Sequence, residues 1–176
     1  MPVQFNFTDM SLRIWVLLRQ TYNLLSQCGE MVIRDAEITL KQYYVLIAIK
    51  YIKGPVTQSE VARWLDRKPN SITTIIDRME KDGLVERTRN PRDRRSSQLV
   101  ITTRGHDVMG RATKPAMIMM KRMMACLSSE EMSTFIQLLE KLKGAACEQL
   151  NPEEPVQELK IDVSRKIDDL MKNKAG

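Results

Sequence analysis

The sequence predicts a mainly helical protein that carries one small antiparallel β hairpin. Three observations support this fold class. Glycine is scarce, with 7 in 176 residues, and long stretches keep the apolar spacing of amphipathic helices. Several of these stretches begin with a capping-box pattern, in which Ser or Thr lies three residues before Glu or Gln. The alternation of apolar and polar residues that is typical of strands is confined to residues 84–101.

The chain has a basic excess, with a formal net charge of +6 and an isoelectric point near 9.3. We therefore expect an anionic partner, either nucleic acid or an acidic membrane surface. The start, MPVQFNFTDM, lacks the features of a signal peptide, and the longest apolar run, 43–49, is too short to span a bilayer. The cysteines lie far apart, which argues against zinc and against a disulfide scaffold and favours a reducing cytoplasm: Cys28, Cys126 and Cys147.

The N-terminal part predicts two helices joined by a connector. Thr8 is the expected N-cap of the first helix, whose apolar positions share one face: Leu12, Trp15, Leu18, Tyr22 and Leu25. Residues 31–38 are the expected connector. Thr39 and Gln42 form a capping box ahead of YYVLIAIKYI, a helix that is apolar on most faces and is therefore expected to be central. Gly54-Pro55 ends it.

Two shorter helices follow. Thr57 and Glu60 form a capping box at the start of a short third helix, with three side chains expected to face inward: Val61, Ala62 and Leu65. Pro69 suits the first turn of a fourth helix, and Gly83 suits its C-terminal end. The fourth helix has one apolar face: Ile72, Ile75, Ile76 and Met79. Its opposite face is polar: Asn70, Ser71, Thr73, Thr74, Asp77 and Arg78.

A basic hairpin comes next. Leu84–Arg87 and Gln98–Ile101 are the expected strands, and Asn90-Pro91-Arg92-Asp93 supplies the turn. The hairpin is crowded with arginines: Arg87, Arg89, Arg92, Arg94 and Arg95. A solvated charged loop is the common fate of such a run. Two helices joined by a brief turn and followed by a basic hairpin, however, are the arrangement of a winged helix-turn-helix.

The C-terminal part predicts further helices. Thr102 or Thr103 begins a long helix to Ala125, which Pro115 should kink or divide. Ser128 and Glu131 form another capping box, which opens a helix to about Leu150. After the break at residues 151–155, either a final amphipathic helix or a disordered tail is expected.

The segment LVERTRNPRDRRSSQLVITTRG closely resembles the wing of the multiple-antibiotic-resistance regulator (MarR) family. The family's Asp, Arg, Leu-Thr and Gly correspond here to Asp93, Arg95, Ile101 with Thr102, and Gly105. The isoleucine departs from the family pattern. TQSEVARWL and IIDRMEKDGLVERT also resemble the family's third helix and recognition helix. The resemblance covers residues 8–150 and does not extend to residues 151–176.

The resemblance implies a homodimer whose N- and C-terminal helices interlock. It also implies binding to a near-palindromic operator, most often as a repressor of a nearby promoter, and release by a small phenolic or other aromatic effector. The expected fold is thus a winged helix-turn-helix with N- and C-terminal dimerisation helices. Its expected parts are an N-terminal dimerisation helix with connector (8–38), a DNA-binding domain (39–105), C-terminal dimerisation helices (106–150) and an extra helix or tail (151–176).

The fourth helix is the candidate reader of the major groove. Four short polar side chains lie near its N-terminus: Asn70, Ser71, Thr73 and Thr74. A merely solvated outward face is the alternative. Arg78 is expected to meet a phosphate or to brace Asp93 in the wing. Backbone N–H groups from Thr57 to Ser59, at a helix start, could hold another phosphate.

The wing supplies the remaining DNA contacts. By resemblance, Arg95 enters the minor groove and Asp93 orients its guanidinium group, while Arg92 and Arg94 add phosphate contacts. Residues 84–105 hold six arginines against two acidic residues. Because a membrane-binding protein would more naturally place basic residues along an amphipathic helix, DNA is favoured over a membrane.

Other function classes are less well supported. No catalytic motif is present, so neither an enzyme nor a cofactor is expected, and an isolated His106 predicts no metal site. A winged-helix protein-interaction module remains an alternative. So does a redox-sensing regulator that uses Cys28, although its place near a helix C-terminus favours a packed thiol. Trp15, Tyr43 and Tyr44 are candidates for an effector pocket. The methionines of residues 117–124 are expected to serve dimer packing or such a pocket.

Overall fold

The computed structural model describes residues 9–89 and 97–150. In chain order these residues form α1 (Met10–Ile33), the 3-10 helix η1 (Arg34–Ala36), α2 (Leu40–Tyr51), α3 (Gln58–Trp64), α4 (Pro69–Lys81), β1 (Val85–Arg89), β2 (Ser97–Ile101), α5 (Thr103–Met124) and α6 (Ser129–Leu150). A mainly helical fold with a small antiparallel sheet was the predicted class, and it is confirmed. The expected cap Thr8, the turn at 90–93 and the segment 151–176 lie outside the described residues.

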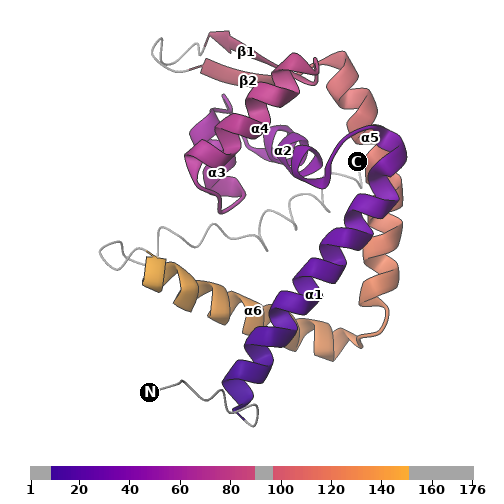
Figure 1. The fold of residues 1–176 in the computed structure, drawn as a ribbon, viewed down its shortest axis with the longest axis vertical. Coiled ribbons are helices and arrows are strands. Elements are labelled where there is room, and N and C mark those ends of the chain that lie inside the picture. Colours follow the sequence, from indigo (N-terminus) through magenta and orange to yellow (C-terminus); the bar gives the residue numbers. More distant parts are fainter. Residues whose placement is uncertain (1–8, 90–96, 151–176) are drawn as a thin grey trace, which may run out of the picture.

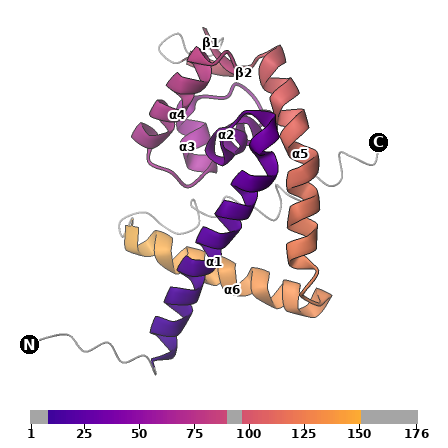
Figure 2. The same cartoon turned by 45° about the vertical axis from the view of Figure 1, so that its right-hand side comes forward.

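The elements form a compact lobe with long helices attached. In Figure 1, α2, α3, α4 and the hairpin gather in the lobe at the top, and α1 and α5 extend downward from it. Figure 2 shows α6 leaving the far end of α5 and running back toward α1. Helix α4 and the hairpin that follows it lie on the outside of the lobe, away from α6.

Helix α1 differs from its prediction at both ends. It begins after Asp9, whose carboxylate accepts a hydrogen bond of 2.8 Å from the Ser11 N–H. At the other end, the predicted connector over residues 31–38 was wrong in part, because the helix continues through Ile33 and turns into η1. Ile33 and Ala36 are buried in the core, so apolar packing extends the helix beyond the point expected.

Helix α2 is central, as its apolar character predicted. Its capping box forms, with the Thr39 side chain accepting from the Gln42 N–H and the Gln42 side chain accepting from the Thr39 N–H. Val45, Leu46 and Ala48 are fully buried. The helix packs against α1, α3, α4, α5 and β2, and the lobe therefore has a single core built around it.

The predicted helix-turn-helix also forms. Thr57 and Glu60 make the second capping box at the start of α3, and Pro69 lies in the first turn of α4. Side chains from both helices enter the core: Val61, Ala62, Ile72, Ile76 and Met79. Leu65 and Ile75 are partly buried against it. This packing fixes the polar face of α4 on the outside of the lobe.

The hairpin strands are shifted and lengthened relative to the predicted ones. Val85 pairs with Ile101 at the base and Arg89 pairs with Ser97 at the outer end. The edge of β2 that faces away from β1 is also hydrogen-bonded, because the Leu99 N–H donates a hydrogen bond of 2.7 Å to the Val56 carbonyl. The segment between α2 and α3 thus ties the hairpin to the lobe.

Thr102 joins the hairpin to α5. Its hydroxyl donates to the Gly83 carbonyl at 2.6 Å and accepts from the Gly105 N–H at 3.0 Å. Its own N–H donates to the Leu84 carbonyl at 3.2 Å. A Cβ at position 105 would lie 2.1 Å from that same Leu84 carbonyl oxygen, so only glycine fits there. The Thr102 and Gly105 of the family pattern therefore hold the base of the wing together.

The C-terminal helices leave much apolar surface uncovered. Pro115 lies inside α5 but does not divide it. The Ser128–Glu131 capping box opens α6 as predicted. None of the residues of α6 is buried. Exposed large apolar side chains are spread over α1, α5 and α6: Ile14, Trp15, Leu17, Tyr22, Leu24, Ile118, Met120, Phe135, Ile136, Leu138, Leu139 and Leu142.

Candidate DNA-binding surface

The polar start of α4 lies beside α3, and the opposite end of the helix leads into the hairpin (Figure 1). Asn70, Ser71 and Thr74 are exposed, and Thr73 is half-buried. The structure thus brings together the four residues that were predicted to read bases. An exposed helix N-terminus with short polar side chains has the shape and the hydrogen-bonding groups that enter a major groove.

The two threonine hydroxyls are already engaged within the protein. The Thr73 hydroxyl donates to the Pro69 carbonyl at 3.0 Å, and the Thr74 hydroxyl donates to the Asn70 carbonyl at 3.3 Å. Gln58, at the start of α3, donates its side-chain N–H to Thr73. This role of the Gln58 side chain was not predicted, since its only sequence signal is its place just after the α3 cap. Donation to a base would cost each threonine an existing bond, which favours the methyl groups as the reading elements.

At the start of α3, fewer backbone N–H groups are free than the predicted phosphate contact from Thr57 to Ser59 assumed. The Thr57 N–H donates to the Glu60 carboxylate at 2.6 Å and is therefore occupied. The N–H groups of Gln58 and Ser59 are the first two of the helix, and helical geometry gives them no carbonyl partner. These two amides, next to the exposed Ser59, are the ones that could meet a phosphate.

Arg87 has a different role from the one that its place among the hairpin arginines indicated. Its guanidinium group lies 2.5 Å from the Asp77 carboxylate and also pairs with Glu80. Its backbone N–H donates to Glu80 at 3.3 Å. The hydrogen bond to Asp77 raises the pKa of Arg87. The residue is therefore committed to holding β1 against α4, whereas Arg89, two residues on, is exposed.

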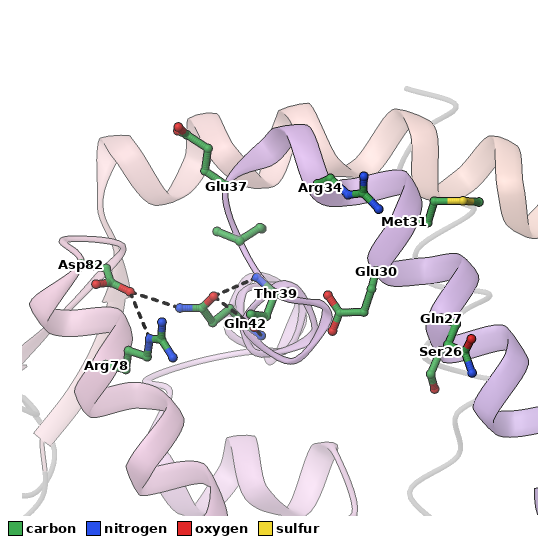
Figure 3. Close-up of a pocket in the computed structure, with 11 residues that line it drawn as sticks. Ser26, Gln27, Glu30, Met31, Arg34, Glu37, Thr39, Gln42, Arg78 and Asp82 are labelled. Carbon is green, nitrogen blue, oxygen red and sulfur yellow. Dashed lines mark hydrogen bonds and ion pairs between the residues drawn. The ribbon is translucent and has the colours of Figure 1, made fainter.

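Arg78 lies at the exposed end of α4. Its Nε is 3.9 Å from the Asp82 carboxylate, and 75% of its side chain is exposed. Asp82 also accepts a hydrogen bond of 3.3 Å from the Gln42 side chain. Figure 3 shows this link between α4 and the start of α2. Since the Arg78 contact is long and exposed, the guanidinium group can leave Asp82 for a phosphate at little cost.

An open polar hollow of about 650 Å³ adjoins that link, between α1, α2 and α4 (Figure 3). It is lined by Ser26, Gln27, Glu30, Met31, Arg34, Glu37, Ile38, Thr39, Gln42, Arg78 and Asp82. The charges are mixed, with three carboxylates and two guanidinium groups, so the hollow has no strong preference for one sign of ligand charge.

Four predicted wing residues lie outside the described residues: Arg92, Asp93, Arg94 and Arg95. Their attachment points are described, because Arg89 ends β1 and Ser97 begins β2. The chain that carries them therefore starts and returns at the outer end of the hairpin. Their roles on DNA stay predictions.

The sequence profile of the MarR family matches residues 38–97. The transcriptional repressor MdtR of Bacillus subtilis is 32% identical over 109 residues, which cover 62% of this chain and 70% of that protein. The chain belongs to the MarR family. It is thus a DNA-binding transcriptional regulator, as the winged helix-turn-helix predicted.

Solved MarR-family structures share the fold. The organohalide-sensing regulator RdhR, solved with 2,4-dichlorophenol bound, superposes with a TM-score of 0.76 at 21% identity, over 87% of this chain and 90% of that one. A MarR variant from E. coli, solved with operator DNA, superposes with a TM-score of 0.71 at 22% identity, over 78% of this chain and 99% of that one. The shared fold includes the helices outside the winged domain.

The three residues predicted to line an effector pocket in this MarR-family chain are not gathered at one place. The Tyr43 and Tyr44 rings are neighbours, with centroids 6.1 Å apart. Tyr43 is buried and donates its hydroxyl to Thr113 at 3.3 Å, and burial raises its pKa. Trp15, on the N-terminal half of α1, is 65% exposed. None of the three lines the polar hollow.

Within residues 9–89 and 97–150, no group of three or more His, Cys, Asp or Glu side chains could hold a metal ion. Cys28 and Cys147 are half-buried, Cys126 is exposed, and all three are free thiols. None of the described helices is both long and apolar enough to cross a membrane.

Proposed function

We propose that the protein acts as a homodimer on a near-palindromic operator and represses a nearby promoter until a small aromatic effector releases it. The geometry of α4 is the observation that supports DNA binding most directly. Its apolar face is locked into the core by Ile72, Ile76 and Met79, so the polar N-terminal face is held outward on a rigid element. A DNA-binding helix that is held in this way loses little orientational freedom when it binds.

The uncovered helices support the dimer. An α6 without a buried residue cannot be stabilised by its own chain alone. Its exposed Leu138 and the exposed Leu24 of α1 belong to apolar faces that a second copy would cover. Two-fold symmetry would then set the two α4 helices on successive major grooves, which requires a separation of about 34 Å.

The wing completes the proposed grip. Arg95 would enter the minor groove with Asp93 orienting it, while Arg92 and Arg94 would contact phosphates. Support comes from Arg87, whose pairing with Asp77 and Glu80 ties the hairpin to the recognition helix. Groove-reading side chains on α4 and arginines beyond β1 would therefore move as one unit.

The relatives support the proposed effector and the proposed direction of regulation. RdhR was solved with 2,4-dichlorophenol bound, which supports a small aromatic effector here. Of the predicted contacts, Tyr43 and Tyr44 are neighbours, whereas Trp15 lies apart from them on the N-terminal half of α1. MdtR is a repressor, which supports repression. Because transcriptional regulators of this kind are not enzymes and act on DNA, we further propose that the chain has no catalytic activity and works in the cytoplasm.

Binding to the DNA upstream of its own gene tests the proposal. Fluorescence anisotropy with the full chain should show saturable binding of one dimer per operator duplex, and a scrambled duplex of the same length should bind at least 100-fold more weakly, by the usual specificity ratios. Equal affinity for both duplexes would contradict sequence-specific regulation. A dimer that binds neither duplex would favour a protein-interaction module.

A further inference from the structure

A second hollow, of about 450 Å³, lies between α1 and α5. It is lined by Cys28, Met31, Val32, Pro115, Ile118, Met119, Arg122 and Met123. Four of these eight side chains carry sulfur. Such a concentration of sulfur in one hollow is unusual and has no part in the proposed DNA contacts.

The sulfur-bearing residues come in pairs at helical spacing. Cys28 and Met31 are three residues apart on α1, and Met119 and Met123 are four residues apart on α5. Residues at these spacings share one face of a helix. Because α1 and α5 pack against each other, the two pairs line the same hollow, one pair from each helix. Two pairs on facing helices are a common way to build a metal site in helical proteins.

We propose that this hollow binds one soft monovalent metal ion, Cu(I), through the thiolate of Cys28 and the thioethers of Met31, Met119 and Met123. Thiolate and thioether ligands select Cu(I), whereas zinc prefers thiolate, imidazole and carboxylate. On binding, the Cys28 thiol releases its proton to solvent and forms the copper–sulfur bond, and the metal keeps its oxidation state.

The surroundings suit such an ion. The rest of the lining is apolar except for Arg122. The positive charge of Arg122 would repel an isolated cation. A thiolate–Cu(I) unit carries no net charge, however, so Arg122 does not oppose it. Cys28 is only half-buried and Met31 is 59% exposed, which leaves the ion a route into the hollow. Methionine side chains are flexible enough to turn their sulfurs toward an ion.

Competition for Cu(I) against the chromophoric chelator bicinchoninate, in anaerobic buffer with ascorbate and without DNA, tests the proposal. The full chain should withdraw one Cu(I) per protomer. Cys28→Ser and the double variant Met119→Leu/Met123→Leu should each bind at least tenfold more weakly. Because DNA is absent, this result is independent of the proposed operator binding.

Two controls match these changes. Met120→Leu alters an exposed methionine of the same helix that does not line the hollow, and Cys126→Ser/Cys147→Ser removes the other thiols. Both should keep the affinity of the original chain. If the double variant of the half-buried Met119 and Met123 unfolds, Met31→Leu replaces it, since Met31 is largely exposed. The proposal fails if the chain takes no Cu(I) from bicinchoninate. It also fails if the control variants lose as much Cu(I) affinity as the hollow variants, because the sulfur atoms of the hollow would then have no special role in binding and would serve packing only.

Discussion

The junction at Gly105 gives the sharpest test of how the hairpin is held. In Gly105→Ala, the new Cβ would lie 2.1 Å from the Leu84 carbonyl oxygen and 2.7 Å from Ile101 Cγ2. Ordinary contact needs about 3.4 Å, so the base of the hairpin must move by about 1 Å from α5. Such overpacking costs about 1–3 kcal/mol. The shift also weakens the Thr102 hydrogen bonds to Leu84 and Gly83, worth about 1 kcal/mol each.

We therefore expect Gly105→Ala to lower the free energy of unfolding by about 2–4 kcal/mol. The measurement is urea denaturation followed by circular dichroism at one fixed protein concentration, since dimerisation makes stability depend on concentration. Gly110→Ala is the matched control, because it lies in the same helix with nothing within 4 Å of the new Cβ. It should stabilise the protein by up to about 1 kcal/mol. Equal stability of the two variants would show that the close approach of Leu84 and Ile101 to position 105 does not hold the hairpin.

Three further changes test other contacts. Arg87→Gln removes both carboxylate pairs to α4 and should lower the free energy of unfolding in urea by about 1 kcal/mol. Arg89→Gln is the control at an exposed position, and an equal loss of stability there would contradict a special role for Arg87. Thr74→Ser removes the methyl from the α4 face but keeps the hydroxyl that donates to the Asn70 carbonyl, and it should change the preferred operator in a binding-site selection; an unchanged preferred site would exclude the Thr74 methyl from base reading. Leu138→Glu, at a position that is 59% exposed, should shift sedimentation from dimer to monomer, while Gln137→Glu should not; an intact Leu138→Glu dimer would place the interface elsewhere.

Features governed by local chemistry could be predicted from the sequence. The capping boxes at Thr39 and Thr57 form, and Pro69 begins α4, because each depends on residues within one turn of the helix. The expected position of the polar α4 face also follows from local periodicity. The general order of helices and hairpin, and hence the winged helix-turn-helix, was predictable for the same reason.

Features that depend on distant residues could not be predicted. The pairing of Arg87 with Asp77 and Glu80 joins β1 to α4, and a charge count along the hairpin cannot distinguish such an arginine from one that faces DNA. The extension of α1 through Ile33 depends on burial in a core formed by later helices. The engagement of Thr73 by Gln58 likewise appears only when α3 and α4 are packed together.

In the proposed complex, α4 and the arginines beyond β1 contact the same DNA duplex. Anisotropy titrations of the operator over a series of salt concentrations, with the original chain and Arg95→Ala, test it most directly. We expect Arg95→Ala to bind more weakly and to reduce the slope of log affinity against log salt by about 1 per half-site. Lys121→Ala, on the exposed face of α5, should leave both unchanged. An Arg95→Ala protein with the original affinity and slope would contradict the account.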